Sequence, residues 1–276
     1  TRPSYREINL DKESTLAQKI FAWIGKDPYG CWGADGFAEE YYKALPTLSP
    51  TLLNIARITD LIGRYKEGEI DFPSKILSEG SGPSMLWSAY QDLSKLISNS
   101  GLKIPEVWDR DKEPLMLKLG ENPNQIVGCM TGNKSKFKES EFDMVDNASI
   151  HLLQYNVHRK ASFEEANRIL KDNGLLELTF KNKKPIKDFY KGLEDLGFNI
   201  LSNPGDGFQI NDEYYQQLKL DRGEHYANSY KSKLNNTSII LAQKEGTPTK
   251  KEIRKVNPNV FDIDTSSKMG DDEFPI

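Results

Sequence analysis

Two glycines in the stretch KILSEGSGPSMLWSAY (75–90) are the first residues whose type and spacing could do chemistry. A β-type run precedes Gly80 and Gly82, and a helical pattern follows them. Without a Cβ atom these glycines let the backbone turn sharply and approach a ligand closely, and the free N–H groups at the start of the helix can receive a carboxylate. A tight loop that binds nothing explains the pair equally well. A dinucleotide fingerprint would place a third glycine at the position of Met85, so the pattern disfavours NAD.

A second candidate is the row formed by His151, Tyr155 and His158. His151 and Tyr155 lie four residues apart on one face of a predicted helix and could move a proton, although two packing residues would show the same spacing. His158 is predicted to lie on the surface. No carboxylate nearby has ligand spacing to this row, so we predict no metal site.

Composition limits the classes of function. The chain has 276 residues, 37% of them hydrophobic and 28% charged, which suits one globular domain with extensions. The net charge of −4 gives no overall attraction to nucleic acid or to an anionic membrane, but the basic patches KNKKPIK (181–187) and KKEIRK (250–255) leave local contacts open. No run of about 20 apolar residues occurs, so we expect a soluble protein. The two cysteines form no CxxC motif, which favours a reducing, cytoplasmic location over a disulfide framework.

The elements that would position these residues alternate along the chain. Short apolar runs predict seven strands, at 75–79, 104–109, 125–130, 141–146, 174–180, 197–202 and 237–243. Helical patterns separate the first six strands, at 83–98, 112–119, 148–157, 162–172 and 185–196. This alternation predicts a doubly wound α/β domain, in which a mainly parallel sheet is covered on both faces and binds ligands at the carboxyl ends of its strands.

Two extensions flank this domain, which we assign to residues 71–245. Residues 1–70 are predicted to be a helical N-terminal extension that caps the site, with Ser49 capping a helix. Residues 246–276 are rich in charge, Pro, Ser and Thr and are predicted to form a flexible tail. The final GDDEFPI resembles the acidic, apolar-tipped peptide by which bacterial single-stranded DNA-binding proteins recruit partners, so the tail could dock on a protein partner.

Five blocks of the sequence, in order, resemble the class I S-adenosylmethionine-dependent methyltransferases of the small-molecule, type-11-like pattern. They are ILSEGSGPSML, EVWDRDKEPLML, VGCMTGNKSKFKESEFDMV, ASIHLL and EANRILKDNGLLELTF. The family blocks read approximately VLDIGSGPG, VDISPEML, GDAEDLPFPDNSFDVV, ALHHL and EARRVLKPGGRLVLT. The resemblance is clear over 75–180 and weaker through LEDLGFNI and NNTSIILAQKEG. It implies a Rossmann-like seven-stranded sheet with an antiparallel last strand, and S-adenosyl-L-methionine as cofactor.

The resemblance also implies roles for individual residues. Gly80, Ser81 and Gly82 would line the methionine part of the cofactor, and Asp109 would accept both ribose hydroxyls as a bidentate carboxylate. The remaining implied cofactor contacts are Glu79 and Arg110 near the turn, Gly132 and Asn133 beside the adenine, Asn147 and Ala148 near the transferred methyl, and Tyr42 in a segment similar to the family's FAEHYDRL. His151 falls where the family often has the histidine of LHH, and with Tyr155 it is the candidate catalytic pair.

The first motif departs from the family pattern. The family's first-strand acid lies two residues before the first glycine, where this chain has Ser78. The acid Glu79 comes one residue later and would face the other side of the sheet unless the strand carries a bulge. Ser84 replaces the third glycine, and Asn133 replaces the family's usual Asp.

Three functions stay open. The first is methyl transfer to an unidentified acceptor, in which the protein mainly aligns the reactants and excludes water. The second is a catalytically inactive methyltransferase-like module for binding or structure, which the altered first motif favours. The third is a part of a larger nucleic-acid-processing assembly, suggested by the basic patches and by a chain that begins with Thr1 instead of Met.

Overall fold

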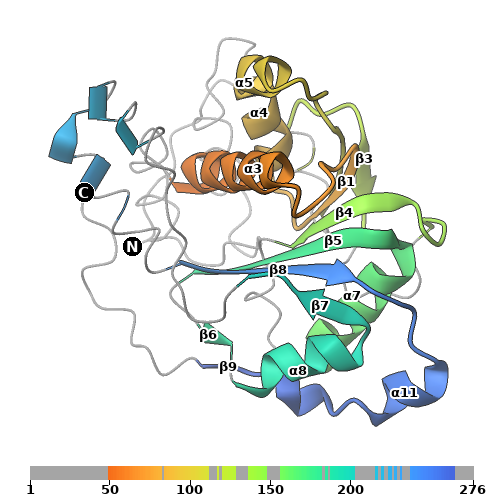
Figure 1. Ribbon diagram of the computed structural model, residues 1–276. Coiled ribbons are helices and arrows are strands. Elements are labelled where there is room, and N and C mark those ends of the chain that lie inside the picture. Colours follow the sequence, from red (N-terminus) through yellow and green to blue (C-terminus); the bar gives the residue numbers. More distant parts are fainter. Residues whose placement is uncertain are drawn as a thin grey trace, which may run out of the picture.

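A seven-stranded sheet forms the centre of the computed structural model. The structure describes residues 49–82, 84–111, 117, 120–128, 136–147, 156–181, 184–185, 187–202, part of 215–231, and 237–264. The strands of the sheet are β1 (Lys75–Glu79), β2 (Glu106–Asp111), β3 (Gln125–Val127), β4 (Phe142–Asn147), β5 (Leu170–Lys181), β7 (Phe198–Ile200) and β8 (Thr237–Lys244). Their order is β3-β2-β1-β4-β5-β8-β7 (Figure 1).

The direction of the strands matches the prediction. The pairs β2–β3, β1–β2, β1–β4 and β4–β5 are parallel, whereas β8 is antiparallel to both of its neighbours, β5 and β7. The predicted Rossmann-like α/β sheet with an antiparallel last strand is therefore confirmed. A second, two-stranded sheet pairs β6 (Lys184–Pro185) with β9 (Ile263–Asp264).

Helices cover both faces of the sheet (Figure 1). One face carries α3 (Ser49–Glu67), α4 (Met85–Asp92) and α5 (Ser94–Asn99), and the other carries α7 (Asn156–Ile169) and α8 (Asp188–Asp195). Each face has its own apolar core. The first core includes Ile58, Leu61, Ile76, Tyr90, Val107, Met144 and Leu175, and the second includes Leu77, Val145, Phe163, Leu176, Phe180, Phe189 and Phe261. In the described part of the chain no helix is long and apolar enough to cross a membrane.

Helix α3 lies within the region predicted to be an N-terminal extension, yet it belongs to the main core. Ile58, Leu61 and Ile62 recur at the spacing of one helical face and are buried. They pack in the same cluster as Ile76 of β1 and Met144 of β4. The described part of the extension is thus a layer of the domain.

Several predicted helix boundaries are wrong. The helix predicted at 83–98 is divided into α4 and α5 at Leu93, across which the apolar pattern continues and so conceals the break. A single helix, α7, crosses the gap predicted between 148–157 and 162–172, because the intervening residues contain no Gly or Pro to end it. It ends at Ile169, and β5 begins directly after it. The predicted helix at 112–119, apart from Leu117, lies outside the described residues.

The tail predicted to be flexible is ordered over residues 246–264. It contains α11 (Lys250–Lys255), the 3-10 helix η3 (Pro258–Phe261) and β9. Thr249 and Glu252 form a capping box at the start of α11, and the ring of Phe261 is fully buried against Phe163 and Phe189. The prediction of a loosely attached segment fails here because a few apolar residues among many charges are enough to anchor it. Residues 265–276, which include GDDEFPI, lie outside the described part.

Candidate functional site

The turn that connects β1 with α4 contains Gly80 and Gly82, and we call it the glycine turn. It lies where the strand order of the sheet reverses. The chain leaves β1 for β2 and β3 on one side and later returns to β4 on the other side of β1. Such a reversal point, at the carboxyl ends of the strands, is where open α/β sheets bind ligands. The turn connects β1 with the start of α4, as the sequence predicted.

Three residues of the turn have left-handed backbone conformations. The φ angles are 62° at Gly80, 55° at Gly82 and 59° at Ser84. Glycine adopts this region without strain, whereas a residue with a Cβ atom pays roughly 1–2 kcal/mol. Ser84 therefore occupies a position suited to a third glycine, in agreement with its alignment to the last glycine of GSGPG.

The end of β2 holds the turn in place. The N–H groups of Gly80 and Ser81 donate to the carbonyl of Arg110 at 2.8 and 3.3 Å. The N–H of Gly82 donates to Oδ2 of Asp111 at 2.9 Å. Asp111, the last residue of β2, is buried and so brings a carboxylate directly to the glycine turn.

A row of polar residues crosses the sheet beneath the turn, on the face covered by α3 and α4. Asp109 of β2 is in register with Ser78 of β1, Ser78 with Asp146 of β4, and Asp146 with Glu177 of β5. All four side chains are buried. We call these four residues the polar row.

Arg57 of α3 neutralises one end of the polar row. Its guanidinium donates to Asp146 and to Glu177, and it also donates to Oδ1 of Asn54 at 2.9 Å. Burial by itself lowers the pKa of Arg57, but the two carboxylates raise it above its ordinary value. Burial raises the pKa of Glu177, against the effect of Arg57. α3 is thus tied to the sheet by charge as well as by its apolar face.

Asp109 lies at the other end of the polar row, and no cation faces it among the described residues. Its Oδ2 accepts from Nδ2 of Asn122 at 2.8 Å, whereas its Oδ1 is buried and has no hydrogen-bond partner. Burial raises the pKa of Asp109 to about 6, the nearby polar groups of Ser84 and Asn122 lower it, and the charges of Asp146 and Asp111 raise it. The structure therefore places Asp109 inside the domain, under the start of α4.

Glu79 and Arg110 face the opposite side of the sheet, where they pair with each other. They are in register on β1 and β2, with no bulge between them, and two hydrogen bonds join the guanidinium to the carboxylate. Phe137 stacks on the guanidinium, 5.7 Å from its ring centroid. Burial raises the pKa of Glu79, and Arg110 opposes this effect. The structure thus joins these two predicted cofactor contacts to each other and turns them away from the polar row.

The remaining predicted site residues are placed only in part. Asn147 ends β4, is buried, and donates from Nδ2 to the hydroxyl of Ser162 in α7 at 3.2 Å. The other predicted contacts lie outside the described residues, namely Tyr42, Gly132, Asn133, Ala148, His151 and Tyr155. In the part that the structure describes, no cluster of three or more His, Cys, Asp or Glu side chains could hold a metal ion.

Comparisons with known proteins give structural matches only. No family model matches the sequence, and no curated protein matches it either. The chain is similar to a TehB-like S-adenosylmethionine-dependent methyltransferase from Corynebacterium glutamicum, with 14% identity, 79% of this chain and 100% of that chain covered, and a TM-score of 0.46. It is also similar to a chain of the complex between the Haloferax volcanii Trm112 methyltransferase activator and a methyltransferase. The identity is 13%, the match covers 71% of this chain and 96% of that chain, and the TM-score is 0.44. A third similar structure is CalS10, an amino pentose methyltransferase from Micromonospora echinaspora. Here the identity is 18%, the match covers 50% of this chain and 54% of that chain, and the TM-score is 0.38.

Since these scores all lie below 0.5, the assignment of the fold rests on the sheet itself. Its seven strands, the parallel pairing of its first five strands and its antiparallel β8 are those that the resemblance implies. The fold is that of the class I methyltransferases.

The sequence after β2 contains a second match to the family pattern, which places the acid of this block at a different residue. DKEPLML, which begins at Asp111, matches the family's DISPEML without a gap and with proline and Met-Leu in common. The matching acid is then Asp111, whereas the prediction chose Asp109, two residues earlier. The structure agrees with this alignment, because Asp111 ends the strand and bonds to the glycine turn. For Arg57, by contrast, the sequence offers no comparable signal.

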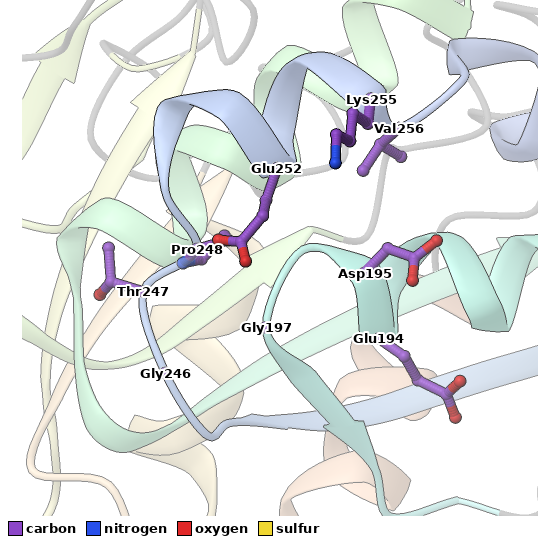
Figure 2. Close-up of a pocket in the computed structure, with 9 residues that line it drawn as sticks. All are labelled: Glu194, Asp195, Gly197, Gly246, Thr247, Pro248, Glu252, Lys255 and Val256. Carbon is purple, nitrogen blue, oxygen red and sulfur yellow. The ribbon is translucent and has the colours of Figure 1, made fainter.

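A surface hollow of about 600 Å³ lies at the opposite edge of the methyltransferase sheet (Figure 2). It is lined by Glu194, Asp195, Gly197, Gly246, Thr247, Pro248, Glu252, Lys255 and Val256. Gly197 precedes β7 and Gly246 follows the antiparallel β8, so both lie at the amino edge of the parallel strands. This hollow is therefore separate from the glycine turn, and we assign no ligand to it.

Proposed function

We propose that the protein binds S-adenosyl-L-methionine at the carboxyl edge of the sheet and transfers its methyl group to an acceptor. One observation carries the proposal. The turn after β1, with three left-handed residues, is held against the end of β2 by the bond from the Gly82 N–H to the Asp111 carboxylate. A closely approachable backbone next to a buried carboxylate fits a ligand that has a charged amino acid end and a ribose diol.

Asp111 replaces Asp109 in our proposal as the acceptor for the ribose hydroxyls. It ends β2 next to the turn, whereas Asp109 is fully buried below Ser84. Gly80, Ser81 and Gly82 remain the proposed contacts of the methionine part. We keep the contacts outside the described residues as proposals, together with Asn147 beside the transferred methyl.

When bound, the cofactor supplies a methyl group that its sulfonium has already activated. The chain then needs to align the acceptor and exclude water, with a base only if the acceptor loses a proton. His151 and Tyr155 are the proposed proton acceptors. A cytoplasmic location and a protein partner at GDDEFPI are further proposals that rest on the sequence alone.

Calorimetry with S-adenosylhomocysteine tests this function. We expect a dissociation constant in the micromolar range, where ~1 μM corresponds to about −8 kcal/mol. Asp111→Asn should weaken binding at least tenfold. Asp143→Asn is the matched control, because Asp143 accepts from Ser74 and Lys75 at the amino edge of the sheet. Failure of the wild-type protein to bind at millimolar ligand would refute the proposal.

A second candidate is an inactive module with the methyltransferase fold. The observation that favours it is the pair of Glu79 and Arg110, which takes two of the predicted contacts out of the site. Such a module would give no binding of S-adenosylhomocysteine, or binding without methyl transfer from labelled S-adenosylmethionine to any acceptor in an extract of the native source. Transfer of label to an acceptor would exclude this candidate.

A further inference from the structure

The turn that leads from α7 into β5 contains the one Asn-Gly pair of the sequence, Asn173–Gly174. β4 is in register with β5 at Leu170 and then again at Leu175, with a register shift between the two. The register of β5 with β8 also begins at Leu175. Residues 171–174 therefore form a bulge, which lies at the amino edge of the sheet, opposite to the edge that carries the glycine turn.

The packing of the bulge requires glycine at position 174. A Cβ atom built on Gly174 would lie 2.8 Å from the carbonyl oxygen of Lys171 and 3.2 Å from that of Asp143. Real Cβ atoms essentially never come within 3.0 Å of another heavy atom, and a backbone oxygen cannot turn away as the end of a flexible side chain can. As a result, the backbone nitrogen of Gly174 has no Cβ atom beside it.

The backbone at position 173 favours asparagine. Its φ angle of 61° is left-handed, and among residues with a Cβ atom Asn and Asp adopt this conformation most readily. The carbonyl oxygen of Asn173 accepts from Nε2 of Gln243 at 3.1 Å, which holds the bulge against β8. Asn173 is exposed, so its amide is in contact with water. Two separate requirements of the fold thus place an exposed asparagine directly before a glycine.

An asparagine before a glycine can lose its side-chain amide without an enzyme, and asparagine counts among the thermolabile residues for this reason. The backbone nitrogen of the following residue attacks the side-chain carbonyl carbon, so that a new C–N bond closes a five-membered succinimide ring. The bond from this carbon to the amide nitrogen breaks, and that nitrogen leaves as ammonia with the proton of the attacking N–H. Water then opens the ring at one of its two carbonyl carbons and gives aspartate or isoaspartate.

We propose that Asn173 is a site of spontaneous deamidation in the folded protein. The exposed amide supplies the leaving group, Gly174 supplies a nitrogen that no side chain crowds, and water is the only other reactant. Isoaspartate carries the main chain through its side-chain carbon and so lengthens the backbone by one atom, within a bulge whose backbone atoms are in close contact. This product should weaken the junction of α7 with β5. The inference is independent of the proposed function, because the bulge lies at the amino edge of the sheet.

Mass spectrometry of the full chain, incubated at neutral pH and physiological temperature, tests the proposal. The tryptic peptide 172–181 contains Asn173 as its only asparagine. The tryptic peptide 256–268 is the internal control, because Asn259 is also exposed but precedes the β-branched Val260. We expect deamidation at Asn173 to be at least tenfold faster than at Asn259, with isoaspartate among the products.

Asn173→Gly is the matched variant, because glycine adopts the left-handed conformation of the bulge and has no amide to lose. The thermal midpoint of the wild type should fall during incubation as isoaspartate accumulates, whereas the midpoint of Asn173→Gly should stay constant. The peptide measurement uses the wild-type chain alone, so it decides the question even if the variant does not fold.

Three results would overturn the inference. Equal rates at Asn173 and Asn259 would show that the bulge gives the first asparagine no special reactivity. Deamidation of Asn173 only after unfolding in urea would show that the folded bulge keeps the amide away from the backbone nitrogen of Gly174. An equal fall of the thermal midpoint in the wild type and in Asn173→Gly would show that the loss of stability arises elsewhere in the chain.

Discussion

At the scale of single residues, the domain buries charged side chains on both faces of the sheet. The groups that stabilise these charges differ between the two faces. Glu79 and Arg110 form a one-to-one pair on the face of α7. On the other face Arg57 serves two carboxylates, and Asp109 relies on hydrogen bonds from neutral groups. Removal of one partner from a buried ion pair leaves an uncompensated charge, which destabilises the protein. We therefore expect mutations on the two faces to change the free energy of unfolding in different ways.

Arg57→Met should destabilise the protein strongly. It would leave Asp146 and Glu177 buried next to each other without a cation, which costs roughly 3–5 kcal/mol. Urea unfolding at neutral pH measures the loss. Arg64→Met is the control from the same helix, because Arg64 forms partly exposed pairs with Asp60 and Glu69 that are worth less than about 1 kcal/mol. Equal losses for the two variants would contradict the role of Arg57.

Asp109→Asn should change how stability depends on pH. Burial raises the pKa of Asp109 from its ordinary 3.8 to about 6, so the stabilisation due to its protonated form is complete below pH 3.8 and is lost as pH rises through about 6. The wild-type free energy of unfolding should therefore fall relative to that of the variant over this window, by on the order of 3 kcal/mol.

Asp143→Asn is the control for this measurement, with the opposite sign. Burial tends to raise the pKa of Asp143, but hydrogen bonds from Lys171, Ser74 and Lys75 lower it below its ordinary value. Its stabilisation is present above that value and is lost on acidification, so the wild type should gain relative to this variant as pH rises. A constant difference between the wild type and Asp109→Asn would refute the assignment.

At the scale of elements, the segment after β8 is joined to α8 by close packing. The glycine of α8, Gly192, leaves space for η3: a Cβ atom built there would lie 2.5 Å from Cγ2 of Val260 and 2.8 Å from Cε1 of Phe261. Real Cβ atoms essentially never approach so closely. The packing against η3 therefore leaves no room for a Cβ atom at this position of α8.

The two helical glycines Gly192 and Gly63 should respond to alanine with opposite signs. Gly63→Ala in α3 should stabilise the protein by about 0.5–1 kcal/mol, because a Cβ there meets no described atom within 4 Å and alanine is the better helix former. Gly192→Ala should destabilise it by roughly 1–3 kcal/mol through overpacking against η3. Thermal or urea unfolding measures both. Stabilisation by Gly192→Ala would show that η3 does not pack there in solution.

At the scale of the whole molecule, the described residues form one domain, in which α3 is the first described helix along the chain and η3 is the last. α3 packs in the core of one face, and Phe261 packs in the core of the other. Neither is attached to only one element, so the sheet and both flanking segments should unfold together. A ligand at the glycine turn would then stabilise all of them at once.

S-adenosylhomocysteine at 100 times its dissociation constant should raise the free energy of unfolding by about 2.7 kcal/mol. Urea unfolding followed by tryptophan fluorescence and by far-UV circular dichroism should give one coincident transition, shifted by the ligand with an unchanged m value. Asp111→Asn should lose most of the shift at the same ligand concentration. Two separate transitions would contradict the single domain.

The sequence by itself determined the strand-helix alternation and the glycine turn, because these depend on residues that are neighbours in the chain. The antiparallel last strand was implied only by the resemblance to the methyltransferase family. Even the left-handed position of Ser84 follows from its place in the motif. Only the tertiary structure decided the partners of the charged side chains. Glu79 and Arg110 are 31 residues apart, and Arg57 and Asp146 are 89 apart.

The same distinction explains the choice between Asp109 and Asp111. Both acids lie on one face of β2, where periodicity alone cannot tell them apart. Their roles depend on where the strand ends, which neighbour shares their register, and how deeply each is buried. The ordering of residues 246–264 was likewise decided by tertiary packing, since a composition rich in charge does not reveal that Phe261 meets two buried rings on α7 and α8. Local sequence patterns specify the helices and strands, whereas contacts between distant residues decide that Asp111 is the carboxylate that bonds to the glycine turn.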